Sequence, residues 1–329
     1  MGSRGAAADG RVVWAIDLGG TNTKVGLVAA DGRIVARGVL ATRHERGGDA
    51  WCDEVVSALR EAAGRCGVSE DAVEAMGVGA PGPLNAKEGV LTNPMPNLPG
   101  WQGFPICAAL RARTGKPVFL DNDANCAGLA EHWAGAGRGV SDLIVLTLGT
   151  GIGSGVIAGG RLLHGAGGNA GELGHISINF RGPRCACGSR GCIELYACSS
   201  AVTSRYRRKL RKAGRPLTGS AAITAEGVFA AAEAGDEAAQ ETYREVGERL
   251  GMAIASMVHA FNPEMVVLAG GMAGAAKLLL GPVRRVVRER TYPEHHAGLR
   301  IEASELGEMA GLLGAARLAL VAGREGAAG

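Results

Sequence analysis

The chain has 329 residues, a length that allows one large domain but that we expect to form two lobes. Hydrophobic residues make up 47% and charged residues 20%, which is typical of a globular chain and excludes a disordered one. The formal net charge of +3 is too small to indicate a nucleic-acid or membrane-surface partner. The sequence shows no secretory leader and no apolar run of membrane-spanning length, so it favours the cytoplasm.

The chain opens with two apolar strands separated by a glycine-rich turn. Residues 12–17 and 25–29 are the predicted strands, and a third is expected from Arg33 onward. The turn at residues 19–21, Gly-Gly-Thr, offers backbone N–H groups and a hydroxyl with no bulky side chain in the way, which suits a phosphate group. It is not a Walker loop, because no Gly-Lys-Ser/Thr segment opens a helix after it.

The same pattern returns at residues 142–163, where a strand, a glycine turn and two further strands follow one another. Aligned with residues 12–35, the Leu-Gly of the first turn matches 148–149 and the Gly-Arg at 32–33 matches 160–161. Such a repeat predicts two related lobes, and two facing glycine turns could grip a polyphosphate from both sides. A chance similarity of glycine-rich hairpins stays open as the alternative, because the chain has 54 glycines.

The remaining elements follow from hydrophobic periodicity and turn residues. Helices are predicted at 53–65, 126–134, 239–260 and 308–320, and strands at 118–121 and 265–268. Residues 77–82 match the spacing G-x-G-x-x-G, but the prolines that follow prevent a helix there, so we reject a dinucleotide site. A tight loop that brings bare backbone to a ligand is expected at Gly82, and residues 93–101 are predicted to form a proline-rich surface loop.

Four polar residues occupy five positions where a predicted strand meets a helix. These are residues 121–125, Asp-Asn-Asp-Ala-Asn. A helix N-cap needs only one such side chain, so we expect some of them to face a ligand. The alternative that they only cap the helix stays open.

Three cysteines and a histidine lie close together in the sequence. Cys185, Cys187 and Cys192 follow His175, and three thiolates with one imidazole form the closed tetrahedral set typical of structural zinc. A disulfide, or three unrelated thiols, is the alternative. It is disfavoured because a Cys185–Cys187 bridge would be strained and nothing indicates a secreted chain. The other cysteines show no pairing pattern and are predicted to be buried free thiols: Cys52, Cys66, Cys107, Cys126 and Cys198.

Two glutamates flank this cluster. Glu172 precedes His175 by three residues, and Glu194 follows Cys192 by two. A metal in the cluster would fix both carboxylates, and carboxylates beside a neutral imidazole suit a ligand rich in hydroxyl groups. The alternative is that both carboxylates only face water.

From Asp17 to the last helix, the chain resembles the ROK family of sugar kinases and sugar-responsive repressors. The most specific part is Glu172-x-x-His175 with the cysteine set and Glu194; the segments at 17–21, 122–123 and 148–151 also resemble the family. The resemblance implies an α/β, two-lobed actin-like and RNase-H-like ATPase fold with duplicated lobes and a cleft between them. We expect a smaller lobe at 11–121, with the helix at about 308–322 packed back on it. The larger lobe is expected at 122–307, with the zinc loop at 175–192.

The resemblance also implies the site. Asp123 would be the base that takes the proton from a sugar hydroxyl. The sugar would be bound by Gly82, Asn122, Asp123, Glu172, His175 and Glu194. ATP and Mg²⁺ would be bound by Asp17, Gly19, Gly20, Thr21, Lys24, Gly149, Thr150, Gly151, Gly270 and Gly271. Structural Zn²⁺ would be bound by His175, Cys185, Cys187 and Cys192.

The implied activity is ATP-dependent phosphorylation of a hexose. Residues 80–83 and 97–101 look most like the bacterial glucokinase branch, so we expect glucose first, then mannose, N-acetylglucosamine, N-acetylmannosamine or fructose. A repressor of the family is disfavoured, because only sixteen residues precede Asp17 and leave no room for a helix-turn-helix domain. Polyphosphate-dependent glucokinases are disfavoured because they resemble shorter chains without the cysteine set.

The partners that we expect are the sugar, ATP and further copies of the chain in a homodimer or homotetramer, with no nucleic acid and no membrane. The basic run at 204–215 is predicted to be a solvated helix face, with a docking patch as the alternative.

Overall fold

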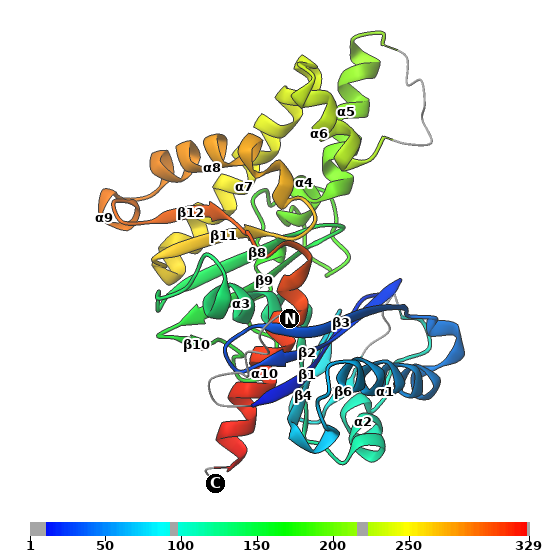
Figure 1. Ribbon diagram of the computed structural model, residues 1–329. Coiled ribbons are helices and arrows are strands. Elements are labelled where there is room, and N and C mark those ends of the chain that lie inside the picture. Colours follow the sequence, from blue (N-terminus) through cyan, green and yellow to red (C-terminus); the bar gives the residue numbers. More distant parts are fainter. Residues whose placement is uncertain (1–10, 93–97, 216–222, 328–329) are drawn as a thin grey trace, which may run out of the picture. The chain divides into compact units, whose positions relative to one another are not determined.

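The computed structural model describes residues 11–92, 98–215 and 223–327, and these form two compact units (Figure 1). The first unit takes the residues up to Arg138, the short segment 164–170 and the residues from Glu308 onward. The second unit takes residues 139–163 and 171–307. The chain therefore passes from one unit to the other after residues 138, 163, 170 and 307.

This division differs from the boundary at 121/122 that the resemblance implies. Helix α3 (Asp123–Ala134) packs on helix α10 (Ala310–Ala327), and both belong to the first unit. The side chain of Gly77 consists of hydrogen alone, and a methyl group there would overlap the carbonyl oxygen of Ala315 in α10. A methyl group at Gly314 would likewise overlap the carbonyl oxygen of Cys126 in α3. Glycine is therefore required at both positions so that α10 can approach the sheet and α3 closely.

The first unit is built on a five-stranded sheet. Its strands are β1 (Val12–Leu18), β2 (Asn22–Ala29), β3 (Ile34–Ala41), β4 (Val73–Ala80) and β7 (Val118–Asn122), in the order β3-β2-β1-β4-β7. The first three strands form an antiparallel meander, and β4 and β7 continue the sheet in parallel with β1. A separate pair, β5 (Leu84–Asn85) and β6 (Val90–Leu91), follows β4.

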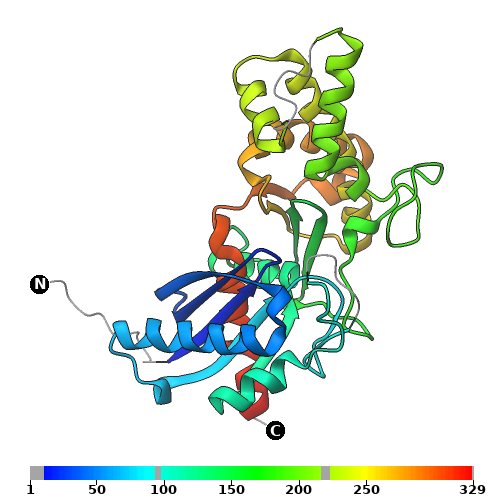
Figure 2. The same cartoon turned by 90° about the vertical axis from the view of Figure 1, so that its right-hand side faces the viewer.

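Helices cover both faces of this sheet. Helices α1 (Gly48–Arg65) and α2 (Ile106–Thr114) lie on one face, and α3 and α10 lie on the other (Figures 1 and 2). In α1, the buried Trp51, Val55 and Leu59 recur every four residues and so form the stripe that faces the core. Because both faces of the sheet are covered, β1 has apolar residues at successive positions and does not alternate between apolar and polar residues.

The second unit repeats the same sheet. Its strands are β8 (Leu143–Leu148), β9 (Ile152–Ala158), β10 (Arg161–Leu162), β11 (Met265–Ala269) and β12 (Arg300–Ala303), in the order β10-β9-β8-β11-β12. An antiparallel meander is again followed by two parallel strands. The repeat seen in the sequence is thus a duplicated sheet.

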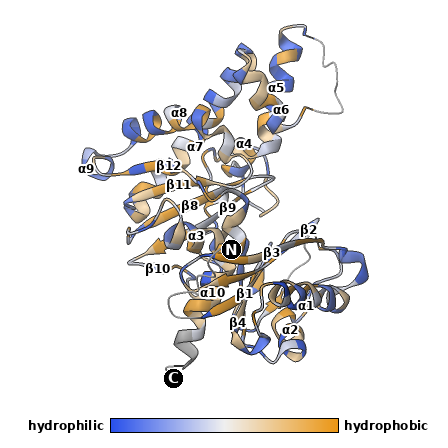
Figure 3. Cartoon of the chain, viewed as in Figure 1, coloured by the Kyte–Doolittle hydropathy of each residue, from blue (hydrophilic) through white to orange (hydrophobic). Residues whose placement is uncertain are grey.

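Helices of very different length complete the second unit. They are α4 (Glu194–Ala197), α5 (Ser199–Lys212), α6 (Ala225–Glu233), α7 (Glu237–Phe261), α8 (Ala276–Arg290) and α9 (Pro293–His296). The long α7 packs against α4, α5, α6 and α8 and so lies at the centre of this helical layer. Figure 3 shows the strands of both sheets in hydrophobic colours, whereas α5 and α8 carry hydrophilic residues along one side. Among the described residues, no helix combines the length and the apolar character needed to cross a bilayer.

Two local predictions differ from the structure. Residues 93–97 lie outside the described residues, but Leu98 and Trp101 are buried, and the Trp101 indole N–H donates to the carbonyl oxygen of His44 over 3.0 Å. This end of the proline-rich segment is therefore part of the core, because Trp101 also packs edge-on against Trp51. Cys66 is exposed and not buried, since it lies just past the last turn of α1.

The basic run is only partly a solvated face. In α5, Lys209 Nζ lies 2.7 Å from Glu245 Oε1 of α7, and Arg205 Nη1 lies 3.3 Å from Glu245 Oε2. Arg208 and Arg211 are exposed. The prediction of a solvated face is thus wrong for the side of α5 that meets α7, where the neighbouring helix supplies the countercharge.

Candidate functional site

The junction of β7 and α3 presents a carboxylate to solvent. Asn122 is the N-cap of α3, and its side-chain oxygen accepts the backbone N–H of Ala124 over 2.9 Å. Asp123 is the first residue of the helix and is exposed. The Asn122 amide also donates to the carbonyl oxygen of Gly82 over 3.4 Å. Since β4 and β7 are parallel neighbours, the loop at Gly82 and the start of α3 meet at the carboxyl ends of their strands, where open α/β sheets bind ligands.

The four polar residues of this junction divide into two groups. Asp121 and Asn125 are buried and hydrogen-bonded to each other over 2.8 Å, whereas Asn122 is half-buried and Asp123 is exposed. An exposed carboxylate in the first turn of a helix is stabilised in its ionised form by the helix dipole. Asp123 can therefore accept a proton from a ligand, and the buried pair supports the turn beneath it.

The first glycine turn is supported by a buried polar network. The carbonyl oxygen of Gly19 accepts the Thr42 hydroxyl over 2.6 Å, and the carbonyl oxygen of Thr21 accepts the Thr42 backbone N–H over 2.9 Å. Thr42 in turn lies 3.1 Å from the hydroxyl of Thr23, which accepts the Trp51 indole N–H over 2.9 Å. Both threonines are fully buried. Sequence reasoning did not identify this network, because isolated threonines in apolar strands carry no signal of it.

Asp17, Lys24 and the start of α10 lie next to this turn. Lys24 Nζ is 3.9 Å from Asp17 Oδ2, and it donates to the backbone oxygen of Glu308 over 3.0 Å. The bare backbone at Gly311 lets the first turn of α10 lie against the Asp17 carboxylate, where a methyl group would overlap it. Burial raises the pKa of Asp17, and the charge of Lys24 only partly opposes this rise. The ionised form of Asp17 therefore costs the fold free energy.

Replacing Asp17 by asparagine is expected to stabilise the protein. The raised pKa of this acid means that its ionised form destabilises the fold above the folded-state pKa, and that the penalty disappears below the unfolded value of about 3.9. The variant should melt a few degrees higher at pH 7, since ~1 kcal/mol corresponds to roughly 2–4 °C for a domain. The gain should shrink as the pH falls. Calorimetry without ligands, with exposed Asp71→Asn as control, checks this; a lower melting temperature at pH 7 contradicts it.

The second glycine turn, at residues 149–151, joins β8 to β9 in the second unit. Its two glycines bond to each other, with the N–H of Gly149 donating to the carbonyl oxygen of Gly151 over 3.0 Å. Glu194 Oε2 accepts the backbone N–H of Ile152 over 3.0 Å and would be 2.5 Å from a methyl group at Gly151. One oxygen of the predicted sugar ligand Glu194 is thus bound to the predicted phosphate turn.

The predicted nucleoside segment ends beside the same turn. Gly270 follows β11 with a φ of 84°, and a methyl group there would lie 2.6 Å from the carbonyl oxygen of Leu148. No neighbouring atom lies within 4 Å of the position that a Cβ atom would take at Gly271, so the backbone there is open to a flat ligand. Because β8 and β11 are parallel neighbours, the fold brings 149–151 and 270–271 together at the carboxyl ends of the two strands.

Four ligand atoms converge in the segment 175–192. The side-chain donors of His175, Cys185, Cys187 and Cys192 all lie within 4.8 Å of one another. Cys187 Sγ and Cys192 Sγ are 3.6 Å apart, as are Cys185 Sγ and His175 Nδ1. A tetrahedral zinc ion with bonds of about 2.3 Å places two sulfurs about 3.8 Å apart, whereas a disulfide needs about 2.05 Å. The donor set therefore fits a metal ion and not a bridge.

The pKa values of two of these thiols are shifted in opposite directions. Burial raises the pKa of Cys192 to about 12, and a hydrogen bond from the Ser189 backbone lowers the pKa of Cys187. A bound dication favours the thiolate form of both. His175 Nε2, on the other side of the ring, lies 3.9 Å from Glu172 Oε2, beyond hydrogen-bond length but within ion-pair range. The cluster thus fixes His175 next to a mostly exposed glutamate.

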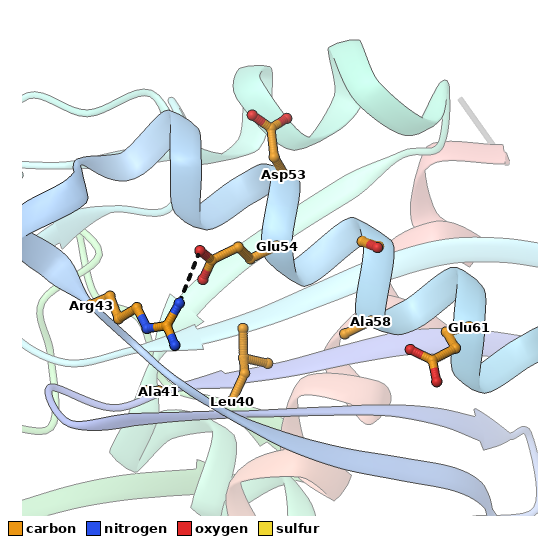
Figure 4. Close-up of a pocket in the computed structure, with 8 residues that line it drawn as sticks. Leu40, Ala41, Arg43, Asp53, Glu54, Ala58 and Glu61 are labelled. Atoms are coloured by element: carbon orange, nitrogen blue, oxygen red, sulfur yellow. Dashed lines mark ion pairs between the residues drawn. The ribbon is translucent and has the colours of Figure 1, made fainter.

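A cavity elsewhere in the first unit contains none of the predicted site residues. It has a volume of about 580 Å³ and lies between β3 and α1. Figure 4 shows Glu54 of α1 facing Arg43, with Leu40 at the base and Glu61 at the far end. The Arg43–Glu54 ion pair, at 3.7 Å, occupies its polar side. The three carboxylates that line the cavity are already paired with arginines, Asp53 with Arg113, Glu54 with Arg43 and Glu61 with Arg65, so we assign no ligand to it.

The structure thus gathers the predicted residues into groups within each unit. In the first unit, Gly82, Asn122 and Asp123 meet at the carboxyl ends of β4 and β7. Asp17 and Lys24 lie by the turn 19–21. In the second unit, Glu194 joins the turn 149–151 and the glycines at 270–271, and Glu172 joins the metal cluster through His175.

Comparisons with known proteins identify the family of the chain. Residues 13–322 match the ROK family. The glucokinase of Thermotoga maritima is 39% identical over 308 residues, which cover 92% of this chain and 95% of that protein. The crystal structure of a ROK hexokinase from Thermus thermophilus is 37% identical, with a TM-score of 0.79 and coverage of 95% and 99%.

A ROK family glucokinase from Streptomyces griseus, solved in complex with glucose and AMPPNP, is 32% identical with a TM-score of 0.79 and coverage of 94% of this chain and 99% of that one. These relatives have the two-lobed actin-like ATPase fold, which confirms the predicted fold class. The match spans both duplicated sheets, the two glycine turns and the cysteine cluster, and the chain belongs to the ROK family.

Proposed function

We propose that this protein is an ATP-dependent hexose kinase that converts glucose to glucose 6-phosphate. The observation that carries the proposal is the junction of β7 and α3, where the exposed carboxylate of Asp123 directly follows Asn122, whose amide donates to the carbonyl oxygen of the loop residue Gly82. Support comes from relatives named as glucokinases and matched over nearly their full length. Mannose, N-acetylglucosamine, N-acetylmannosamine and fructose remain alternative substrates of the same chemistry.

Asp123 is the general base of the proposed reaction. Its carboxylate accepts the proton of the sugar hydroxyl as that oxygen forms a bond to the γ-phosphorus of ATP. The bond from the γ-phosphorus to the oxygen that bridges it to the β-phosphate then breaks, and ADP leaves. Asn122 and the backbone at Gly82 orient the sugar beside the base. Glu172, His175 and Glu194 contribute acceptors for its other hydroxyl groups.

The two glycine turns supply the phosphate contacts. In the turns 19–21 and 149–151, the N–H groups of Gly19 and Gly149 donate to the carbonyl oxygens of Asn22 and Gly151. The backbone N–H groups of Gly20, Thr21, Thr150 and Gly151 are the donors that we assign to the phosphates. Asp17 would hold Mg²⁺, which neutralises phosphate charge when bound. Zinc is the ion that we infer for His175 and the three cysteines, since a closed set of three sulfurs and one nitrogen suits structural zinc. Its role is to fix His175 and Glu172 relative to each other.

A sugar panel tests the proposal directly. The purified protein is assayed with Mg²⁺-ATP or with inorganic polyphosphate against glucose, mannose, fructose, N-acetylglucosamine and N-acetylmannosamine. We expect glucose with ATP to give the highest kcat/KM, and the ³¹P spectrum of the product to show a primary phosphate ester. Higher kcat/KM with an N-acylhexosamine would reassign the substrate. Turnover with polyphosphate but not with ATP would make polyphosphate the phosphoryl donor. If no combination of donor and sugar gives turnover, the proposal is contradicted.

The cellular compartment of the enzyme can be inferred from its substrates. ATP and free hexose occur together inside the cell, so we propose that it acts in the cytoplasm. Assembly into a homodimer or homotetramer also stays a prediction, and light scattering of the purified chain measures it.

A further inference from the structure

Asp121 is a buried carboxylate directly before the two residues of the proposed sugar site. Only 1% of its surface is exposed. Its Oδ1 accepts the backbone N–H of Asn122 over 2.7 Å and the side-chain amide of Asn125 over 2.8 Å. Its Oδ2 lies 2.7 Å from Nε2 of His164, and because an ionised carboxylate only accepts, Nε2 is the nitrogen that carries the proton. Asp121 therefore bonds to both ends of the first turn of α3.

His164 begins a short segment with an unusual position in the chain. Residues 164–170 belong to the first unit, although the residues on both sides belong to the second. The segment closes on itself, with the N–H of Ala170 donating to the carbonyl oxygen of His164 over 3.0 Å. It ends two residues before Glu172, one of the predicted sugar ligands. The imidazole of His164 is thus a side-chain anchor of this segment to the strand that leads to Asp123.

We propose that His164 is a positioning residue for the kinase reaction, which holds Asp121, and through it the first turn of α3 with Asp123, in the orientation that catalysis needs. This proposal rests on the proposed function for the role of Asp123. His164 does not touch the reacting atoms in this mechanism; it acts through the carboxylate of Asp121. By the same contact it also anchors the segment that leads to Glu172.

Three features favour this role over a plain surface ion pair. The acceptor is buried, so no bulk water can replace the imidazole easily, and an Oδ2 without a donor would be free to turn. The hydrogen bond to Asp121, at 2.7 Å, raises the pKa of His164, so the imidazole stays protonated to a higher pH than a free one. The other oxygen of the same carboxylate accepts the N–H of the sugar-site residue Asn122, so rotation of Asp121 would move that backbone.

Two substitutions at His164 distinguish a positioning role in catalysis from a general contribution to the stability of the fold. His164→Leu keeps an apolar side chain of similar size but removes the donor, whereas His164→Gln keeps an N–H donor near the position of Nε2. The matched control is His296→Leu in α9, at a half-buried histidine whose Nδ1 likewise makes a side-chain hydrogen bond, 2.9 Å from the hydroxyl of Thr291. Steady-state kinetics with ATP and glucose, thermal melting, and hydrogen exchange of the backbone N–H groups at 122–125 are measured for all three.

We expect His164→Leu to lower kcat about 10–100-fold, because small displacements of a catalytic group are costly, while the KM for glucose stays within about threefold. His164→Gln should recover most of kcat, and His296→Leu should leave kcat unchanged. Hydrogen exchange of the backbone N–H groups at 122–125 should be faster than in the parent protein for His164→Leu, but not for the other two variants. A His164→Leu enzyme with near-normal kcat, a loss confined to KM, or a Gln variant no better than the Leu variant would overturn the proposal.

The exchange measurement separates this proposal from the proposed function. It needs no substrate, so faster exchange at 122–125 in His164→Leu would support the positioning contact even if the wild-type protein phosphorylated no hexose. Unchanged exchange together with normal glucose kinase activity would remove the positioning role and leave the proposed function intact.

Discussion

The Asp123→Asn variant is expected to lose roughly 10²–10⁴-fold in kcat while binding glucose nearly as well as the parent protein, since this is the usual contribution of a general base. Asparagine keeps the size and most of the hydrogen bonding of aspartate but cannot accept the proton of the sugar hydroxyl. Initial rates at saturating ATP and glucose measure kcat, and calorimetric titration with glucose measures binding.

The opposing possibility is that Asp123 only supports the start of α3. The N-cap of this helix is Asn122, so Asp123 is the first helical residue and the cap remains in the variant. Asparagine also serves well at helix starts, so the fold should be retained under either interpretation. Asp123 Oδ1 accepts the backbone N–H of Ala124 over 2.8 Å. Asp31→Asn is the matched control, because Asp31 likewise accepts a backbone N–H, from Arg33 over 3.0 Å, but in a turn away from the site. Turnover of Asp123→Asn close to that of the control would remove Asp123 from the mechanism.

The second large effect is expected at the cysteine cluster. Cys187→Ser removes one of four ligands at an exposed position, so it costs little core packing and tests the metal itself. The purified parent protein should contain about one zinc per chain, and the variant should contain almost none. The kcat/KM for glucose should fall about 10–100-fold, because His175 and Glu172 lose the support that fixes them.

An exposed cysteine outside the cluster provides the control. Cys66→Ser changes the same chemical group at the end of α1 and should leave zinc content and kcat/KM unchanged. Metal analysis by mass spectrometry and kinetics with varied glucose decide the outcome. A parent protein without zinc, in which all three cluster thiols react freely with a thiol reagent, would contradict a structural metal site.

The sequence by itself determined those features that depend on local spacing. The duplicated strand–turn–strand pattern predicted two sheets of one design, and both have the same strand order. The spacing of His175 and the three cysteines predicted a set of ligands, and these converge within 4.8 Å. Periodicity placed the long helix at 239–260, and the structure has it at Glu237–Phe261. Local patterns suffice here because backbone hydrogen bonding and short-range chain reversal fix these features.

Only the tertiary structure decided which distant residues support the site. The contacts of Thr42 with Gly19, and of His164 with Asp121, join positions 23 and 43 residues apart, and no local pattern marks either pair. Likewise, Trp101 is buried although its segment is rich in proline, because its indole N–H donates a hydrogen bond to the carbonyl oxygen of His44. The structure also places the first boundary between the units after residue 138, whereas the resemblance implied 121/122. The reason is that α3 and α10, which are almost two hundred residues apart in the sequence, pack on each other in the first unit. Such pairings depend on which surfaces the completed fold brings together, and hydrophobic patterning specifies that a surface is buried but not its partner.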